Sequence, residues 1–171
     1  MEKRIAVLPG DGIGKEIIQG AIEILQTVAE RFGHEFSFTY GELGGSAYDA
    51  TGVPLPEATI SLCKESDAIL LGAVGGRQYD TLPVHLRPEQ GLLQIRRELN
   101  LFANLRPTTY YESLADSSPL RKDIIEGVDL LMVRELTGGI YFGKPRERRE
   151  VDGKVAVVDT LYYETSASQS I

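Results

Sequence analysis

The spacing of hydrophobic residues changes twice between residues 4 and 40. Residues 4–8, Arg-Ile-Ala-Val-Leu, form a short run rich in β-forming side chains that ends at Pro9-Gly10. From residue 15 to 32 the hydrophobic residues recur at spacings of three and four, which predicts a helix with one buried face. Hydrophobic and polar residues then alternate over residues 35–40, as in a strand. The chain therefore begins strand, helix, strand.

The same alternation of elements continues to residue 71. Residues 54–65 are predicted to form a helix, and residues 67–71 form a continuous apolar run suited to a strand that is covered on both faces. Strands that alternate with helices predict a parallel sheet with right-handed crossovers. The predicted fold class is α/β.

The second half of the chain has shorter and less regular patterns. A glycine-rich turn at 72–76 follows the third predicted strand. Beyond it the patterns predict, in chain order, a helix at 91–99, a strand at 101–105, a helix between Ser118-Pro119 and Gly127, a strand at 128–133 and an alternating, solvent-edge or arm strand at 154–163. Residues 165–171 are small and polar and show no periodicity.

Composition and charge narrow the possible functions. With 171 residues, 42% of them hydrophobic and 25% charged, the chain can bury a core and holds one or two domains. A net charge of −7 argues against a nucleic-acid partner, and no apolar run is long enough for a membrane span or a secretory signal. Cys63 is the single cysteine, so no intrachain disulfide is possible, which suits the reducing cytoplasm.

The turn Gly10-Asp-Gly-Ile-Gly14 joins the first predicted strand to the first helix. A Rossmann fingerprint would need glycine where Lys15 stands, and a Walker A loop would need Ser or Thr where Glu16 stands. Both nucleotide motifs are therefore excluded. What remains is either a tight structural turn or a turn whose backbone N–H groups approach an anionic ligand, and the turn at 72–76 has the same two readings.

Three arginines and one tyrosine are candidate ligand-binding residues. Arg106 is predicted at a strand end, and the apolar strand before Arg134 would carry that side chain to the edge of a cleft. Together with Arg96 they would suit a dicarboxylate, although for any single arginine a surface pair with one of the 25 acidic residues is the more common case. Tyr141 lies in a glycine-rich segment and is either a packed hydroxyl or an acid–base group. His34 and His85 belong to no recognisable motif.

Four segments, taken in order, decide between these readings. LPGDGIGKE, LLGAVGG, LRPEQGLLQIRRELNLFANLRP and VRELTGGIYFG resemble the β-decarboxylating dehydrogenases, and within them the isopropylmalate branch. The similarity runs from about residue 4 to about residue 163. It implies that residues 1–100 are the amino-terminal part of the first α/β domain and that residues 101–171 begin the second domain, which carries the dimerisation arm.

The resemblance also implies a reaction and its residues. A 2-hydroxy acid, 3-isopropylmalate, would be oxidised by NAD and then lose carbon dioxide, in leucine biosynthesis. The arginines that hold the malate carboxylates fall on Arg96, Arg106 and Arg134, and the tyrosine that protonates the enolate falls on Tyr141. Guanidinium groups beside the phenol would favour its ionised form. The cofactor would lie against residues of the two glycine turns, namely Ile13, Ala73, Val74 and Gly75.

Substrate choice in this family rests on the helix entered through PEQGLL. Here that segment supplies Glu89, Leu92 and Leu93. Two leucines favour a branched alkyl group and give a third carboxylate no donor, so 3-isopropylmalate is preferred over isocitrate, with homoisocitrate and tartrate as further alternatives.

The chain also departs from the family pattern. Lys15 replaces a usual proline, which is a mild change, but the family is about twice this length. The aspartates that bind Mg²⁺ or Mn²⁺, the catalytic lysine donated across the homodimer and the adenosine-binding loop would all follow residue 171. We therefore expect an inactive chain with exposed apolar surface, shortened by a frame disruption or a truncated gene. The alternative is a non-catalytic remnant that either binds a partner or is unstable.

Overall fold

The computed structural model describes residues 1–136 and 138–165. The described residues form two compact units, which divide between Leu99 and Asn100. The polar tail at 166–171 lies outside the described residues. Within the described residues, no helix has the length and apolar character that a membrane span requires.

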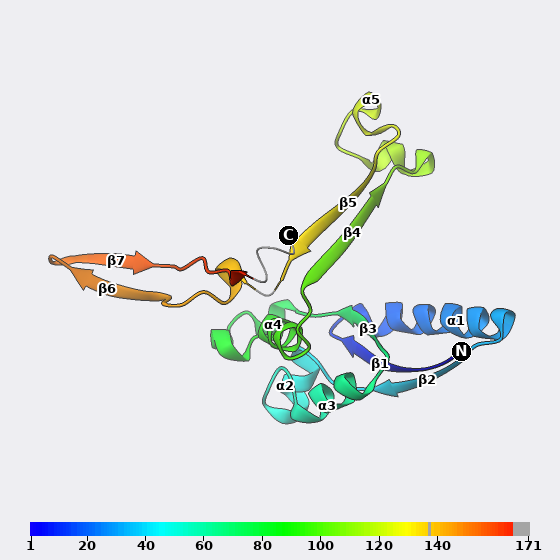
Figure 1. Ribbon diagram of the computed structural model, residues 1–171, viewed down its shortest axis with the longest axis horizontal. Coiled ribbons are helices and arrows are strands. Elements are labelled where there is room, and N and C mark those ends of the chain that lie inside the picture. The colour runs from blue at the N-terminus through cyan, green and yellow to red at the C-terminus, as the bar shows by residue number, and fades with distance from the viewer. Residues whose placement is uncertain (137, 166–171) are drawn as a thin grey trace. The chain divides into compact units, whose positions relative to one another are not determined.

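A parallel three-stranded sheet lies at the centre of the first unit (Figure 1). The strands β1 (Glu2–Gly10), β2 (Glu35–Tyr40) and β3 (Ala68–Ala73) follow the order β2-β1-β3. In the register Ile5 lies opposite Phe38 on one side and Ala68 on the other. The mixed α/β fold predicted from the alternating elements is confirmed.

Both faces of β1 are buried because successive side chains of a strand point to opposite faces. Ile5 and Val7 pack against Ile18 and Ile22 of α1 (Gly14–Phe32). Ala6 and Leu8 belong to a second cluster on the other face, which also contains Leu43, Leu55, Ile60, Cys63 and Ile95. The continuous apolar character of β1 thus reflects a sheet covered on two sides.

Helices α2 (Gly45–Thr51), α3 (Glu57–Glu65) and α4 (Pro88–Glu98), with the short turns η1 (Arg77–Tyr79) and η2 (Val84–Leu86), complete the first unit. The predicted helix at 54–65 begins only at Glu57, because Pro56 has extended backbone and caps it. The helix predicted from 91 begins at Pro88, since proline suits the first turn of a helix. Helix α2 was not predicted.

The second unit consists of two antiparallel ribbons. β4 (Ala103–Thr109) pairs with β5 (Asp129–Glu135), and β6 (Glu147–Val151) pairs with β7 (Lys154–Val158). Three short helices, η3 (Glu112–Ser117), α5 (Lys122–Ile125) and η4 (Gly139–Tyr141), lie between the strands. The strand predicted at 101–105 begins later in the chain, at Ala103, and continues to Thr109. The arm strand predicted at 154–163 ends at Val158.

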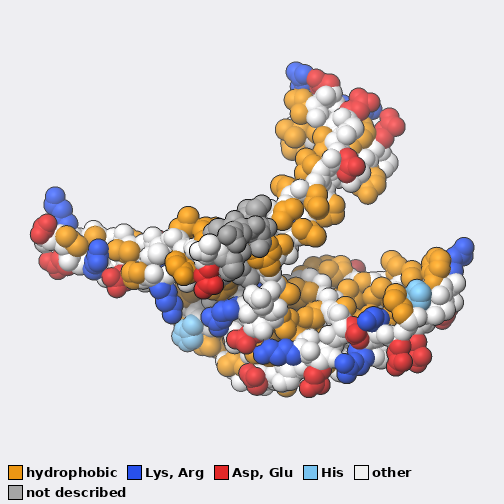
Figure 2. All heavy atoms as spheres, viewed as in Figure 1, with side chains coloured by type: hydrophobic (Ala, Val, Ile, Leu, Met, Phe, Trp, Pro, Cys, Tyr) orange, Lys and Arg blue, Asp and Glu red, His pale blue; other side chains and the backbone are white. Residues whose placement is uncertain are grey.

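The β4–β5 ribbon exposes apolar side chains. Leu131 and Val133 are 55% and 65% exposed, so the expectation that Arg134 follows a buried strand is wrong for this chain. Hydrophobic side chains are visible along this ribbon in Figure 2. The β4–β5 ribbon therefore exposes apolar surface, as expected.

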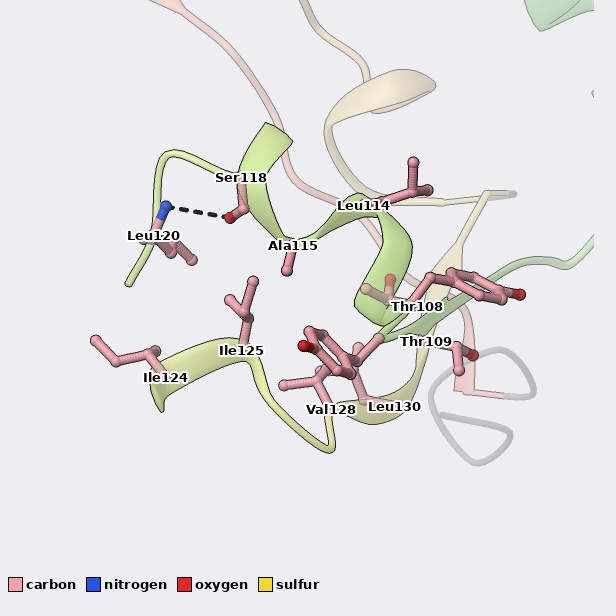
Figure 3. A pocket seen from close by; sticks show the side chains of 12 residues that line it. Thr108, Thr109, Leu114, Ala115, Ser118, Leu120, Ile124, Ile125, Val128 and Leu130 are labelled. Atoms are coloured by element: carbon pink, nitrogen blue, oxygen red, sulfur yellow. Dashed lines mark hydrogen bonds between the residues drawn. The ribbon is translucent and has the colours of Figure 1, made fainter. Parts of the chain in front are cut away.

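An apolar pocket of about 450 Å³ lies where the ribbon meets η3 and α5 (Figure 3). The side chains of Ala115, Leu120 and Ile125 point into the same space. None of the residues expected at the functional site lines this pocket. We therefore assign the pocket to packing in the second unit rather than to the reaction.

Candidate functional site

The two glycine turns meet backbone to backbone at the carboxyl ends of β1 and β3. A Cβ atom on Gly10 would lie 2.0 Å from the carbonyl oxygen of Ala73, and one on Gly14 would lie 2.1 Å from that of Pro9. Gly10 also has a φ of +69°, a conformation that side-chain-bearing residues rarely adopt. Glycine at both positions is thus explained by close packing before any ligand is considered.

Asp11 connects these turns to a third segment. Its side chain is 4% exposed, and its backbone N–H donates to the carbonyl of Ala73 at 2.7 Å. Its carboxylate accepts the backbone N–H groups of Gly45, Ser46 and Gly75 at 2.7–2.8 Å. The sequence reading singled out the glycines and missed Asp11, although an acid in a glycine turn after a buried strand was a usable signal.

The surface beside these turns is open to a ligand. Ile13 is 58% exposed, and no atom lies within 4 Å of the position where a Cβ on Gly12 would be. Ala73, Val74 and Gly75 are half-buried, and Val74 also packs against the apolar core. Ligands of parallel α/β sheets bind outside the carboxyl ends of the strands, so this surface lies where such a ligand would bind.

A polar pocket of about 490 Å³ adjoins the first turn and is lined in part by Asp11 and Lys15. On its wall the hydroxyl of Tyr79 donates to the Asp49 carboxylate at 2.7 Å, and this hydrogen bond raises the pKa of Tyr79. This hydrogen bond joins η1 to α2 beside the turn.

Helix α4 presents Glu89, Leu93 and Arg96 on one face, since residues separated by three and four positions share a side of a helix. A Cβ on Gly75 would lie 2.9 Å from Glu89 Oε1, so the carboxylate stands directly beside the second glycine turn. Glu89 is in the first turn of α4, before the start predicted at residue 91. Leu92 packs against the apolar core, whereas Leu93 belongs to neither core cluster.

Two of the predicted arginines share one face of the β4–β5 ribbon. Asn104 lies opposite Arg134 in the register, and Arg106 Nε donates to Asn104 Oδ1 at 2.6 Å. Side chains two residues apart on a strand point the same way, so both guanidinium groups lie on the side of Asn104. Arg106 is in the middle of β4, which corrects the prediction of a strand end.

Tyr141 lies against one of these arginines, Arg134. The guanidinium carbon of Arg134 is 5.1 Å from the centre of the Tyr141 ring, a cation–π contact. The turn before it is fixed at two points, because Gly138 N–H donates to Glu135 Oε1 at 2.9 Å and Gly139 N–H donates to the carbonyl of Tyr162 at 2.7 Å. These two hydrogen bonds hold the backbone that leads into Tyr141.

The expected site residues therefore form two groups. Ile13, Glu89, Arg96 and the turn at 73–75 belong to the first unit, and Arg106, Arg134 and Tyr141 belong to the second. Within the part of the chain that the structure describes, no group of three His, Cys, Asp or Glu side chains could hold a metal ion.

Known proteins resemble the chain over its whole length. It is 60% identical over 171 residues to the 3-isopropylmalate dehydrogenase of Priestia megaterium, covering 100% of this chain and 46% of that protein. It is 65% identical over 163 residues to the 3-isopropylmalate dehydrogenase of Halalkalibacterium halodurans, covering 95% of this chain and 45% of the relative. The chain thus spans slightly under half the length of these relatives.

Solved structures share the fold. A β-decarboxylating dehydrogenase from Thermococcus kodakarensis matches with a TM-score of 0.62 and 31% identity, over 93% of this chain and 40% of the other. Isocitrate dehydrogenase from Methylococcus capsulatus matches with a TM-score of 0.67 and 27% identity, over 98% and 44% of the two chains.

The sequence pattern of a family described as isocitrate/isopropylmalate dehydrogenase matches residues 4–171. The match continues past residue 163, where the motifs had suggested that the similarity ends. Relatives, structures and family pattern agree with the four sequence motifs, and we conclude that the chain belongs to the isocitrate/isopropylmalate dehydrogenase family.

Proposed function

We propose that this chain is the amino-terminal part of an NAD-dependent 3-isopropylmalate dehydrogenase of leucine biosynthesis. The reaction is the oxidation of 3-isopropylmalate and its decarboxylation to 4-methyl-2-oxopentanoate. The observation that carries the proposal is that Arg106 and Arg134 share one face of the β4–β5 ribbon and that Arg134 contacts the Tyr141 ring. The identity to relatives named 3-isopropylmalate dehydrogenase supports the choice of reaction.

The arginines bind the substrate's carboxylates in this proposal. A guanidinium offers two parallel N–H donors to a carboxylate, and Arg106 and Arg134 are diagonal neighbours on the ribbon, a relationship that places Cβ atoms about 7–8 Å apart or somewhat less. That spacing suits two carboxylates of one small malate. Arg96 would contribute from helix α4 of the first unit.

Tyr141 supplies the proton that replaces the lost carbon dioxide. Its hydroxyl would donate to the carbon of the enolate, and the guanidinium beside the ring would stabilise the phenolate that remains. The hydrogen bonds of Gly138 and Gly139 hold the turn that carries this hydroxyl. Proton transfer thus depends on a group that is fixed before the substrate binds.

The cofactor is proposed to lie against Ile13 and residues 73–75. Bound NAD would supply the acceptor for the hydride of the substrate hydroxyl carbon. Ile13 would offer an apolar surface, and the absence of a side chain at Gly12 would let the ligand approach the backbone. We propose that Mg²⁺ or Mn²⁺ is also required and that its ligands belong to the remainder of a full-length protein.

Helix α4 is proposed to choose the substrate. Leu92 and Leu93 would provide the apolar surface for the branched alkyl group, while Glu89 would disfavour a third carboxylate by charge repulsion. We further propose that the full-length protein is a cytoplasmic homodimer. These assignments come from the family resemblance and from the acidic, single-cysteine composition.

The proposal is tested with a full-length chimera in which residues 1–171 replace the matching segment of the Priestia megaterium relative. NADH formation is followed with NAD and Mn²⁺ on 3-isopropylmalate, isocitrate, homoisocitrate and tartrate. The highest kcat/KM is expected for 3-isopropylmalate. Preference for another of these acids would reassign the substrate, and an inactive but folded chimera would favour a non-catalytic role.

A further inference from the structure

We infer that Asp11 is a positioning residue that sets the shape of the cofactor surface by holding the second glycine turn. This inference rests on the proposed cofactor site, and it concerns a side chain that none of the assignments above uses. Asp11 does not need to touch the cofactor for this role. It acts through Gly75, whose N–H group donates to Asp11 Oδ2 at 2.8 Å.

The carboxylate is buried, and both of its oxygens accept hydrogen bonds. Asp11 is 4% exposed, its Oδ1 accepts Ser46 N–H at 2.7 Å, and its Oδ2 accepts both Gly45 N–H and Gly75 N–H at 2.8 Å. A buried carboxylate costs free energy unless such bonds satisfy it, so the three segments are held together cooperatively. A Cβ on Gly44 would lie 2.5 Å from Oδ2, so the adjoining backbone also packs tightly on this group.

Gly75 lies between the carboxylates of Asp11 and Glu89. Its N–H points to Asp11, and the position of its missing Cβ is 2.9 Å from Glu89 Oε1. Its φ of +112° is accessible mainly to glycine. Because its N–H group is already donated, Gly75 is expected to present its Cα and carbonyl to a ligand rather than its N–H.

The substitution Asp11→Asn separates this role from simple packing. An amide has nearly the same size, but it has one acceptor oxygen and an NH₂ group that cannot accept a hydrogen bond. It therefore places NH₂ against Ser46 N–H or against the N–H groups of Gly45 and Gly75. The matched control is Asp67→Asn, since Asp67 is an exposed carboxylate that accepts the N–H of Arg4 at 2.8 Å, next to the start of β3.

The first measurement is amide hydrogen exchange by NMR on the 171-residue chain. In the unsubstituted chain Gly75 N–H should exchange as slowly as amides of the sheet. In Asp11→Asn it should exchange at least about tenfold faster, the loss expected for a hydrogen bond to a charged acceptor, while amides of β1 change by less than about twofold. Fast exchange of Gly75 in the unsubstituted chain would overturn the inference even if Asp11→Asn does not fold.

The second measurement is titration of the same chain with NAD, read from the amide shifts of Ile13, Ala73 and Val74. Asp11→Asn should weaken the apparent affinity about tenfold or more, and Asp67→Asn should leave it within about twofold. Equal affinity in Asp11→Asn and the unsubstituted chain would overturn the positioning role. If the unsubstituted chain shows no NAD-dependent shifts, the proposed cofactor site fails in this chain, and the Gly75 exchange rates alone decide whether Asp11 holds the turn.

Discussion

The guanidinium of Arg134 stacks over the ring of Tyr141, 5.1 Å from its centre. One residue proposed to bind a carboxylate thereby touches the residue proposed to deliver a proton. The contact links binding to chemistry within a single unit of the chain. A cation over an aromatic face contributes about 0.5–1 kcal/mol of stabilisation at an exposed site. This is enough to orient the ring but too little to determine the fold.

We expect Tyr141→Phe in the full-length chimera to lower kcat strongly while KM changes little. The ring and its contact with Arg134 remain, but the hydroxyl that would transfer the proton is lost. Steady-state kinetics with 3-isopropylmalate measures the two parameters. Tyr163→Phe, which removes a hydroxyl from a neighbouring tyrosine, is the control, and a kcat for Tyr141→Phe within about twofold of the parent would remove Tyr141 from the proposed role.

Arg106→Lys should reduce kcat/KM although the charge is kept. A lysine ammonium cannot reproduce the two-pronged contact of a guanidinium with a carboxylate, and it also loses the bond from Arg106 Nε to Asn104. The expected cost is about 1.5–3 kcal/mol. Arg148→Lys on the exposed strand β6 is the control. Equal kcat/KM in both variants would return Arg106 to a surface role.

A pair of glycines in helix α1 should respond oppositely to alanine. Gly14→Ala would place Cβ 2.1 Å from the Pro9 carbonyl oxygen and 2.7 Å from Ala73 N, so we expect a loss of about 1–3 kcal/mol or more in the free energy of unfolding. Gly20→Ala meets no atom within 4 Å and should gain about 0.5–1 kcal/mol from helix propensity. Urea denaturation followed by circular dichroism measures both. Similar effects of the two substitutions would contradict the packing of the two turns.

Asp67 should give the first unit an acid-sensitive contribution to stability. The backbone N–H of Arg4, followed by the Lys3 ammonium, lowers the pKa of Asp67. Because the folded pKa lies below the unfolded value of about 3.9, the contribution is present above that pH and is lost as the pH falls through the folded pKa. Asp67→Asn should therefore be less stable than the parent at pH 7, with the difference shrinking below about pH 4.

Denaturation midpoints measured across this pH range test the Asp67 prediction. Asp116→Asn on η3 of the second unit controls for the loss of one negative charge. A difference between parent and Asp67→Asn that stays constant down to pH 2 would show that the Asp67 carboxylate does not carry the effect.

The 171-residue chain alone is expected to show no metal-dependent NADH formation from 3-isopropylmalate. Deprotonation of the hydroxyl and stabilisation of the enolate call for a Lewis acid and a base, and arginine side chains supply neither. An assay with NAD and Mn²⁺ beside the active chimera measures this. Turnover by the chain itself would mean that metal ligands lie within residues 1–171.

Much of the first unit was predictable because its periodicities are long. The nineteen-residue helix α1 and the apolar strand β1 both have a clear repeat, and the structure confirms them. Helix α2 has only seven residues, and the N–H groups of its first turn donate to Asp11, more than thirty positions earlier. A contact of that kind is tertiary and leaves no local pattern.

The second unit was harder to predict because its strands are exposed. β4 contains Arg106 and Pro107 and lacks the apolar run that marks a buried strand, so its bounds follow from pairing with β5. Proline is tolerated there because β4 lies at the edge of a two-stranded ribbon. The family resemblance placed Tyr141 and Arg134 in one site, whereas composition and spacing alone left both readings open.

The β4–β5 ribbon also affects how the chain behaves at high concentration. Within the described residues each of these strands pairs only with the other, and its outer edge leaves N–H and carbonyl groups available beside exposed residues such as Leu105 and Val133. Such an edge is a template on which strands of other molecules can add, and it is flanked here by side chains that favour burial. Self-association of the chain should therefore begin at this ribbon and grow by edge-to-edge addition of strands from other molecules.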